Sequence, residues 1–522
     1  MTEDADKTES FWSANKPAFL ALVGLVLVHG ICLRNGFVDF DDDTIFLANQ
    51  HFALSLPEFI AWSFDLERPD TWRPIRDLSH YLDLQIHGQS PLWAHAHNLT
   101  LLVLAAGLTM ALFRVLGVSS ATAAVAAFIG YAHPVQVEVI TWVSGRKDLL
   151  AASLCLCTLL VFIRYVRSAS GHGMAILVVV LSALGVMAKG HLIVMPVLLV
   201  WIYLRLRAEG HAQEDKSWFS VGILLSILSL AALFIAPRIA SGGVALPAEL
   251  QREPTQSILL GDKLQLPLRY LGKIAWPADL NHIYFTPRLD IWHTPMAIVS
   301  MALAVLLLWL IYEGVRKNDI RGHALAVACT LMAPYMHLRT GVVYMADRYL
   351  FLSLPFLALV FVLTVKDFKW WIERADKIKM VLLTLLFTLM VAGSLRPHSA
   401  FQDSPALWTR MTEVYPDSAW GYDRLGRALY HAKQYPAAAG AWLRAAERQP
   451  QAMRHLNNAA VAAMAVGRNK MATQLLLRVL KVEPTNILAL RNLKIMRGSM
   501  DDSDKASLEN SGLPVEEPTK KR

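Results

Sequence analysis

The sequence is poor in charge and in cysteine. Charged residues make up 18% of its 522 residues and hydrophobic residues 55%, whereas a soluble globular chain carries about 25% charge. Its four cysteines all lie in apolar stretches, which argues against a disulfide framework and a thiolate metal cluster. A glycine-rich phosphate loop, a serine triad motif and a zinc motif are also missing. What remains is typical of a polytopic membrane protein with some soluble mass attached.

The formal net charge of +8 does not indicate a nucleic-acid partner. The basic residues stand in short runs between apolar segments, where they determine membrane topology. We therefore predict no nucleic-acid binding and use the basic runs to orient the chain.

Eleven apolar runs approach the roughly 20 residues that cross about 30 Å of hydrocarbon. We predict spans at 17–33, 95–116, 119–132, 148–166, 173–188, 190–204, 218–236, 294–312, 322–337, 349–365 and 379–395. The third and sixth are short, which favours tilted or broken helices. No small-residue cleavage site follows the first run, so we expect a retained anchor after a polar tail at 1–16.

Basic loops follow the fourth, sixth, eighth and tenth spans. The positive-inside rule places these loops and the N-terminus in the cytoplasm. The opposite loops then face outward, at 34–94, 133–147, 237–293 and 338–348. Because the number of spans is odd, the C-terminus is predicted to lie outside as well. The membrane domain would thus cover 17–395.

The C-terminal region has a different pattern. Pro416, Pro450 and Pro484 recur every 34 residues, a period typical of tetratricopeptide repeats. The sequence therefore predicts an all-α protein, a polytopic helical bundle followed by an α-solenoid at 396–497, with an ordinary helical hairpin bundle as the alternative. A solenoid of this kind usually binds a peptide or protein on its concave face. The charged segment 498–522 is predicted to be disordered.

The first outward loop opens with an acidic cluster. Asp39, Asp41, Asp42 and Asp43 place four carboxylates in five residues. Like charges this close raise one another's pKa unless a cation or hydrogen-bond donors compensate. Such a group suits a general base, or a clamp for Mg²⁺ or Mn²⁺ built from Asp41, Asp42 and Asp43. The alternative is a solvated acidic turn.

Cations gather at the same predicted membrane face. Glu138, Arg146 and Lys147 lie at or near the second outward loop, and arginine and lysine are suited to hold phosphate oxygens. Lys189 lies between two apolar runs, where an ionisable residue indicates function by default. The alternatives are an interfacial anchor with a Glu–Arg ion pair, and a lysine that snorkels to the membrane surface.

Three further groups complete this face: Asp347 with Arg348 at the mouth of the tenth span, Arg73 between Trp72 and Pro74, and His95 with Asn98. For each of them, packing or a structural ion pair is the alternative. Together the carboxylates and cations fit a lipid-phosphate donor whose tail lies in the bilayer. A transporter would instead carry charges along a central path.

The order of these motifs carries a family resemblance over most of the chain. The segments concerned are 37–49, 72–74 with His95 and Asn98, 133–148, 271–281 and 345–349. In this order they resemble the polytopic GT-C glycosyltransferases with C-terminal tetratricopeptide repeats, which include the O-mannosyltransferases of the eukaryotic endoplasmic reticulum. The chain departs from that pattern at 45–51, at Lys189-Gly190 in place of a usual Lys-Pro, and in its short repeat array.

The resemblance implies transfer of a sugar, such as the hexose mannose, from a polyprenyl-phosphate donor to a protein or envelope-glycan acceptor. Asp41 or Asp42 would be the base that activates the acceptor, with inversion at the anomeric carbon. Arg146, Lys147 and Arg348 would neutralise the departing phosphate, and Glu138 would orient the acceptor or the sugar. The implied substrate-binding set is Arg73, His95, Glu138, Arg146, Lys147, Asp148, Lys189, Asp347 and Arg348.

The resemblance leaves metal dependence open. Its bacterial character, together with the short loops, predicts a bacterial inner-membrane protein. The alternative function is a non-catalytic membrane scaffold whose repeats recruit an envelope partner.

Overall fold

The computed structural model describes residues 2–66, 72–168, 172–211, 265–285, 295–336, 345–369 and 373–496, with 223, 224, 227 and 228. The described residues are helical and include no β-strand, only one isolated bridge between Tyr284 and Met345. The chain divides into two compact units. We call residues 1–37 with 41–401 the membrane unit, and residues 38–40 with 402–522 the C-terminal unit.

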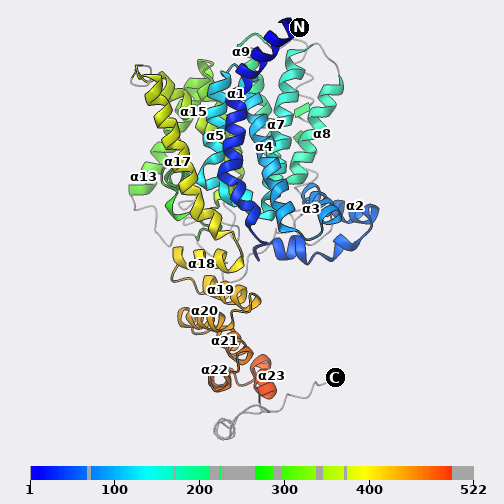
Figure 1. The fold of residues 1–522 in the computed structure, drawn as a ribbon, viewed down its shortest axis with the longest axis vertical. Coiled ribbons are helices and arrows are strands. Elements are labelled where there is room, and N and C mark those ends of the chain that lie inside the picture. Colours follow the sequence, from blue (N-terminus) through cyan, green and yellow to red (C-terminus); the bar gives the residue numbers. More distant parts are fainter. Residues whose placement is uncertain are drawn as a thin grey trace. The chain divides into compact units, whose positions relative to one another are not determined.

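Helices of different lengths build the membrane unit (Figure 1). They are α1 (Thr2–His29), α2 (Leu56–Phe64), α3 (Pro74–His87), α4 (Pro91–Val115), α5 (Ser120–Ala132), α6 (Val137–Thr141), α7 (Arg146–Arg167), α8 (His172–Ala188), α9 (Met195–Ala208), α12 (Leu266–Ala275), α13 (Pro295–Arg316), α14 (Ile320–Met332), α15 (Leu354–Asp367) and α17 (Asp376–Ala400). Helical structure covers most of every predicted span except 218–236, which lies almost entirely outside the described residues.

Six of these stretches are long and apolar enough to cross a bilayer. They are Ser13–Arg34, Pro91–Val115, Val143–Arg167, Gly190–Ala208, Ile298–Arg316 and Asp376–Ala400. The bent pair Ser120–Ala132 and Pro134–Thr141 would make a seventh. The remaining predicted spans that the structure describes fall on shorter helices.

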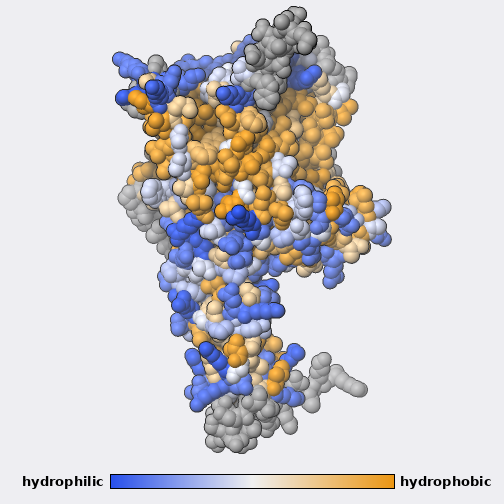
Figure 2. All heavy atoms as spheres, viewed as in Figure 1, coloured by the Kyte–Doolittle hydropathy of each residue, from blue (hydrophilic) through white to orange (hydrophobic). Residues whose placement is uncertain are grey.

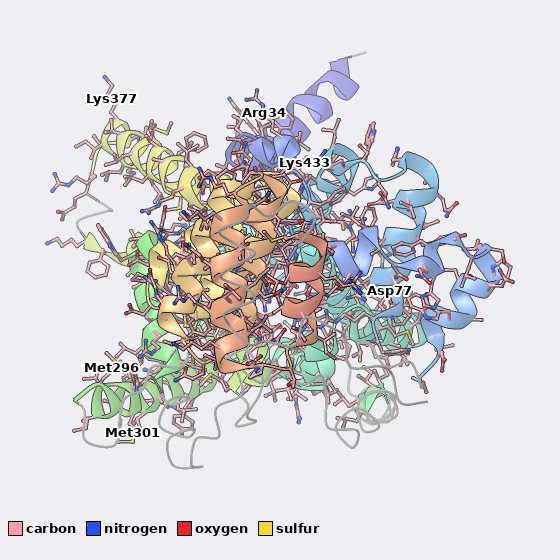
Figure 3. The ribbon with its side chains drawn as sticks, turned by 90° about the horizontal axis from the view of Figure 1, so that it is seen from below. Arg34, Asp77, Met296, Met301, Lys377 and Lys433 are labelled. Carbon is pink, nitrogen blue, oxygen red and sulfur yellow. The ribbon has the colours of Figure 1, made fainter. Side chains whose placement is uncertain are left out.

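On the face shown in Figure 2, apolar side chains cover the membrane unit between two polar ends. On α13, Ile298, Val305 and Leu308 are 66–67% exposed. Met296 and Met301 of the same helix lie at the outer edge of the bundle (Figure 3). A continuous exposed apolar surface of this size is stable only against lipid, because in water it would drive association. The protein is therefore a membrane protein.

Small residues bring the central helices together. Ala123, Ala126 and Ala127 of α5 are buried, and α5 packs against α1, α4 and α15. Helix α7 packs against α4, α8 and α9, and it carries the buried side chains of Leu149, Leu156 and Phe162. Close approach through small residues is the usual way in which helices associate inside a bilayer.

The helix of the third predicted span ends just before a proline. The chain bends by 59° between α5 and the segment Pro134–Thr141, because Pro134 lacks the amide hydrogen needed to continue α5. Gln136 Nε2 donates to the carbonyl oxygens of Gly130 at 2.8 Å and Phe351 at 3.2 Å. These hydrogen bonds satisfy carbonyls near the break, as a non-helical segment at membrane depth requires.

The C-terminal unit is a run of short helices, each packed on the next: α18 (Ser404–Val414), α19 (Ala419–His431), α20 (Tyr435–Arg448), α21 (Arg454–Ala465), α22 (Asn469–Val482) and α23 (Ile487–Met496). Gly426 of α19 lies so close to Trp442 of α20 that an added Cβ would be 2.8 Å from the indole. The predicted boundary at 395 falls inside α17, and the tail at 498–522 lies outside the described residues.

The acidic loop is divided between the two units. Asp39 belongs to the C-terminal unit, where its amide donates to Ser404 Oγ at 2.8 Å and its carboxylate accepts from Trp408 Nε1. Asp41, Asp42 and Asp43 belong to the membrane unit. The four carboxylates therefore have different surroundings: Asp41 is exposed, Asp42 is buried and Asp43 is half-buried.

Candidate functional site

Most of the predicted site residues lie at one end of the membrane unit, which we call the charged end. It is defined by Asp41, Asp42, Arg73, Glu138, Arg146, Lys147, Asp148, Lys189 and Arg348. The first turn of α7 is its centre. Gly145 precedes that turn because a Cβ there would overlap the Val139 carbonyl oxygen. The tight chain crossing turns Arg146, Lys147 and Asp148 inward, and all three side chains are buried.

Arg146 joins three helices. Its Nε donates to Asn98 Oδ1 of α4 at 2.9 Å, and its Nη2 donates to the Ala94 carbonyl oxygen at 2.7 Å. Its Nη1 pairs with the carboxylate of Asp83 on α3. These partners use most of the donors of a guanidinium, whose fork suits several acceptors in fixed directions. Arg146 is therefore already occupied by protein groups, and its role in the structure is to clamp α3 and α4 onto α7.

Asp83 belongs to a polar helix face that the sequence analysis missed. Asp77, His80 and Asp83 recur every third residue along α3, and all three are buried. Residues three apart share one face of a helix. The recurrence of polar residues at this spacing could therefore have revealed the face from the sequence. Burial and the positive charges of Arg146, Arg76 and Lys147 hold the pKa of His80 well below its usual value, so its ring is neutral at neutral pH. Figure 3 marks Asp77 on this helix.

Asp42 holds the loop that precedes α7. The residue is 1% exposed, and its Oδ1 accepts from the backbone amide of Ser144 at 2.9 Å and from the Ser144 hydroxyl at 2.7 Å. The Ser144 carbonyl oxygen in turn accepts from Lys147 Nζ at 2.9 Å. Lys147 Nζ also lies 3.7 Å from the centroid of the Trp142 ring, a cation–π distance. Ser144 is thus the link between the acidic loop and a buried cation.

Asp41 has a different environment from its neighbour. It is exposed, and its backbone has φ 79°, in the left-handed region that disfavours most residues. The turn is held by its carbonyl oxygen, which accepts from the Ile45 amide at 2.8 Å. The negative charge of Asp41 acts on both Arg73 and Lys147. An accessible carboxylate therefore stands within the electrostatic influence of the buried Lys147 and the half-buried Arg73.

Arg73 adds a cation next to Asp41. Burial and the positive charge of Arg76 lower the pKa of Arg73 to about 10, against the opposing charges of Asp148, Asp41 and Asp77. At that pKa Arg73 stays protonated at neutral pH.

Asp148 of α7 forms a buried ion pair with Lys189, the residue that follows α8. Tyr335 and Tyr349 stack beside it with ring centroids 3.9 Å apart, and Lys189 Nζ lies 5.1 Å from the Tyr335 centroid. A recess lined in part by Asp148, Tyr335 and Tyr349 has a volume of about 10 Å³. That space is too small for a sugar ring, so a substrate could enter only if these side chains moved.

Arg348 pairs with Glu138 across the break that follows α5. The carboxylate of Glu138 accepts from the Arg348 guanidinium and, at 2.9 Å, from the Arg348 backbone amide. The guanidinium also lies 5.4 Å from the Trp142 ring centroid and 5.3 Å from that of Tyr349. The pair therefore shares its aromatic neighbours with Lys147 and Lys189.

The remaining predicted residues lie at the edges. Asp347 accepts from the Tyr284 hydroxyl at 2.8 Å, and burial together with the charge of Glu138 raises the pKa of Asp347 well above its usual value. His95 hydrogen-bonds the Gly36 carbonyl oxygen at 3.2 Å. Asp43 is half-buried and begins the turn Asp43–Leu47.

The acidic cluster does not fit a metal ion. Within the described residues, no three His, Cys, Asp or Glu side chains are arranged to hold one. Asp41 is exposed, whereas Asp42 is buried against Ser144. We therefore derive no chemical step through a metal bound at Asp41, Asp42 and Asp43.

The site also uses residues that the sequence analysis did not select, namely Asp77, His80, Asp83, Trp142, Ser144, Tyr284 and Tyr335. A serine or an aromatic residue in an apolar segment has no signal of its own. For Ser144, the one signal in the sequence was its position two residues before Arg146.

Comparison with known proteins finds one partial similarity. The chain is 32% identical over 144 residues to the protein O-mannosyl-transferase Tmtc2 of Drosophila melanogaster. The alignment covers 26% of this chain and 15% of that relative. No family model matches the chain, and no solved structure matches it.

Proposed function

We propose that the chain is a membrane glycosyltransferase of the GT-C type. It moves a sugar, a hexose such as mannose, from a polyprenyl-phosphate donor to a hydroxyl group of a protein or envelope-glycan acceptor. The observation that carries the proposal is the accessible carboxylate of Asp41 within electrostatic reach of two cations, Arg73 and Lys147. The partial similarity to an O-mannosyl-transferase supports the same reaction class.

Asp41 is the general base in this proposal. Its carboxylate accepts the proton of the acceptor hydroxyl while the hydroxyl oxygen bonds to the anomeric carbon. The bond between that carbon and the phosphate oxygen breaks, and its electron pair leaves with the polyprenyl phosphate. Attack from the face opposite the leaving group inverts the anomeric configuration. Asp41 suits the role better than Asp42 because it is exposed, whereas Ser144 occupies Oδ1 of Asp42.

The cations stabilise the leaving group. The donor phosphate gains one negative charge when the glycosidic bond breaks, and fixed positive charge in a buried site favours that change. Lys147, Lys189 and Arg348 are buried, and Lys189 and Arg348 flank Tyr349. Arg146 is assigned a positioning role, because its donors already bind Asn98, Ala94 and Asp83. Glu138 keeps Arg348 in place.

The larger arrangement is part of the proposal. We propose eleven spans, with the charged end outside the cytoplasm in a bacterial inner membrane. The 34-residue proline period and the helix-by-helix packing of the C-terminal unit support a tetratricopeptide solenoid. Its concave face would bind a peptide or protein partner.

The test is the consumption of a labelled polyprenyl-phosphate sugar by the purified full-length chain. Asp41→Asn should lower the rate by about 10²–10⁴-fold, since that is the usual contribution of a general base. Asp43→Asn is the matched control and should retain transfer. Both variants should elute like the parent in size-exclusion chromatography, because neither side chain is fully buried.

Equal transfer by Asp41→Asn and the parent would remove the base assignment. If no polyprenyl-phosphate sugar is consumed, while substitutions in the C-terminal unit abolish binding of an envelope protein, the alternative of a non-catalytic scaffold would replace the enzyme.

A further inference from the structure

A second charged site lies at the other end of the membrane unit. A cavity of about 540 Å³ is lined there by Arg114, Arg167, Arg205, Lys366 and one carboxylate, Glu209. Arg146 and Arg167 are the first and last residues of the 22-residue helix α7, so about 30 Å of helix separates this cavity from the charged end. The cavity is therefore independent of the proposed transfer reaction.

The cations of the cavity exceed the acids that neutralise them. Arg205 pairs with Glu209 at 2.6 Å, and Arg114 donates to Asn15 Oδ1 at 2.9 Å. The buried Nε atoms of Arg167 and Arg205 have no hydrogen-bond partner within the part of the chain that the structure describes. A buried donor without a partner is unfavourable, which points to an acceptor beyond the described residues.

The shape and remaining lining of the cavity also suit an anion. Ser119 caps α5, and its Oγ accepts from the Thr122 amide at 3.4 Å. The first turn of a 13-residue helix therefore faces the cavity, and the positive end of a helix dipole favours a negative group. The volume is in the usual range of small-molecule sites, about 300–1,000 Å³.

The apolar part of the lining distinguishes a lipid from a soluble anion. Leu116, Val118, Ile320 and Leu363 line the cavity beside the cations, and Val115 on its rim is 38% exposed. These residues lie at the ends of apolar helices, where acyl chains would continue from a bound head group. Basic pockets between membrane helices at the end that carries the basic loops are suited to anionic lipid head groups.

We propose that this cavity binds the phosphate group of an anionic phospholipid. The phosphate contacts Arg114, Arg167 and Lys366, and the acyl chains lie along the apolar lining. Arg205 is already paired with Glu209 and shapes the wall of the cavity.

Native mass spectrometry of the full-length chain in neutral detergent tests this site. Short-chain phosphatidylglycerol should bind saturably, and phosphatidylcholine more weakly because its choline cation offsets the phosphate. The double variant Arg114→Gln with Arg167→Gln should bind phosphatidylglycerol at least about tenfold more weakly, since hydrogen bonds to charged groups contribute roughly this much.

The matched control is the double variant Arg164→Gln with Arg207→Gln. Arg164 lies in the last turn of α7, as Arg167 does, and Arg207 lies in the last turn of α9; both side chains are exposed. The control removes the same charge and should bind like the parent. Equal weakening in the two double variants, or no saturable binding by the parent, would overturn the proposal.

Two further arms complete the experiment. If inorganic phosphate competes with phosphatidylglycerol at comparable concentration, the cavity binds phosphate, but its ligand is a soluble anion and the lipid assignment is wrong. If the double variant does not fold, as judged by size-exclusion chromatography, the single variant Lys366→Gln replaces it. Lys366 is exposed, and its loss should also weaken phosphatidylglycerol binding.

Discussion

The two ends of α7 use arginine in opposite ways. Arg146 is fully buried, and side chains or carbonyls of α3 and α4 hold its guanidinium. Arg167 is half-buried, and its Nε has no partner among the described residues. The comparison teaches that a conspicuous cation in a membrane helix is not by itself a ligand site. What decides its role is whether its donors are already used by the protein.

The largest effect is expected when a buried, paired arginine of α7 is replaced and the result is compared with replacement of an exposed arginine of the same helix. Arg146→Ala would leave Asp83 without its buried cation, and such a loss is expected to cost about 3–5 kcal/mol of stability. Arg164→Ala, at the far end of α7, should change stability by less than about 0.5 kcal/mol, because the side chain is exposed. Thermal unfolding of the purified variants measures both. Similar unfolding temperatures would contradict the clamp role of Arg146.

A smaller effect on sugar transfer is expected when the hydrogen bond between Ser144 and Asp42 is removed, since Asp42 has a positioning role and Asp41 is the proposed base. Ser144→Ala removes the hydroxyl that donates to Asp42 at 2.7 Å and keeps the backbone amide. We expect sugar transfer to fall about tenfold, as loss of one hydrogen bond to a charged group predicts. Ser153→Ala is the control, since that hydroxyl bonds to the Leu149 carbonyl oxygen within α7. The rate of donor consumption is the measurement, and unchanged transfer in Ser144→Ala would argue against a positioning role for the pair.

The last expected effect concerns pH. Because the pKa of Asp347 is raised in the folded protein, the folded state binds more protons than the unfolded state above about pH 4. Stability should therefore fall as pH rises toward the folded pKa, by at most about 1.4 kcal/mol per pH unit. Asp347→Asn should flatten this slope, since asparagine resembles the neutral acid and still accepts from Tyr284.

The readout for Asp347 is the unfolding temperature at about pH 5 and about pH 7. Asp376→Asn is the control, because the Asp376 side chain is 96% exposed. An equal pH slope in the parent and in Asp347→Asn would show that another group carries the dependence.

Much of the fold could be read from patterns that are local in the sequence. Apolar runs give helices at 91–115 and 146–167 because helix length and hydrocarbon thickness are matched. The short third run favoured a tilted or broken helix, and the bend lies just beyond it at Pro134, which cannot donate in a helix. The motif residues Glu138, Arg146, Lys147, Asp148 and Lys189 were selected from the sequence, and the structure shows that all five are buried.

The sequence by itself determined that this is a helical membrane protein with charges gathered near particular helix ends, because hydropathy and periodicity are properties of neighbouring residues. Only the tertiary structure decided that Arg146 pairs with Asp83, that Arg348 pairs with Glu138, and that Asp41 is exposed while Asp42 is buried. The reason is physical. Ion pairs form between groups that are distant along the chain, and a carboxylate's role depends on which donors and how much solvent the fold brings to it.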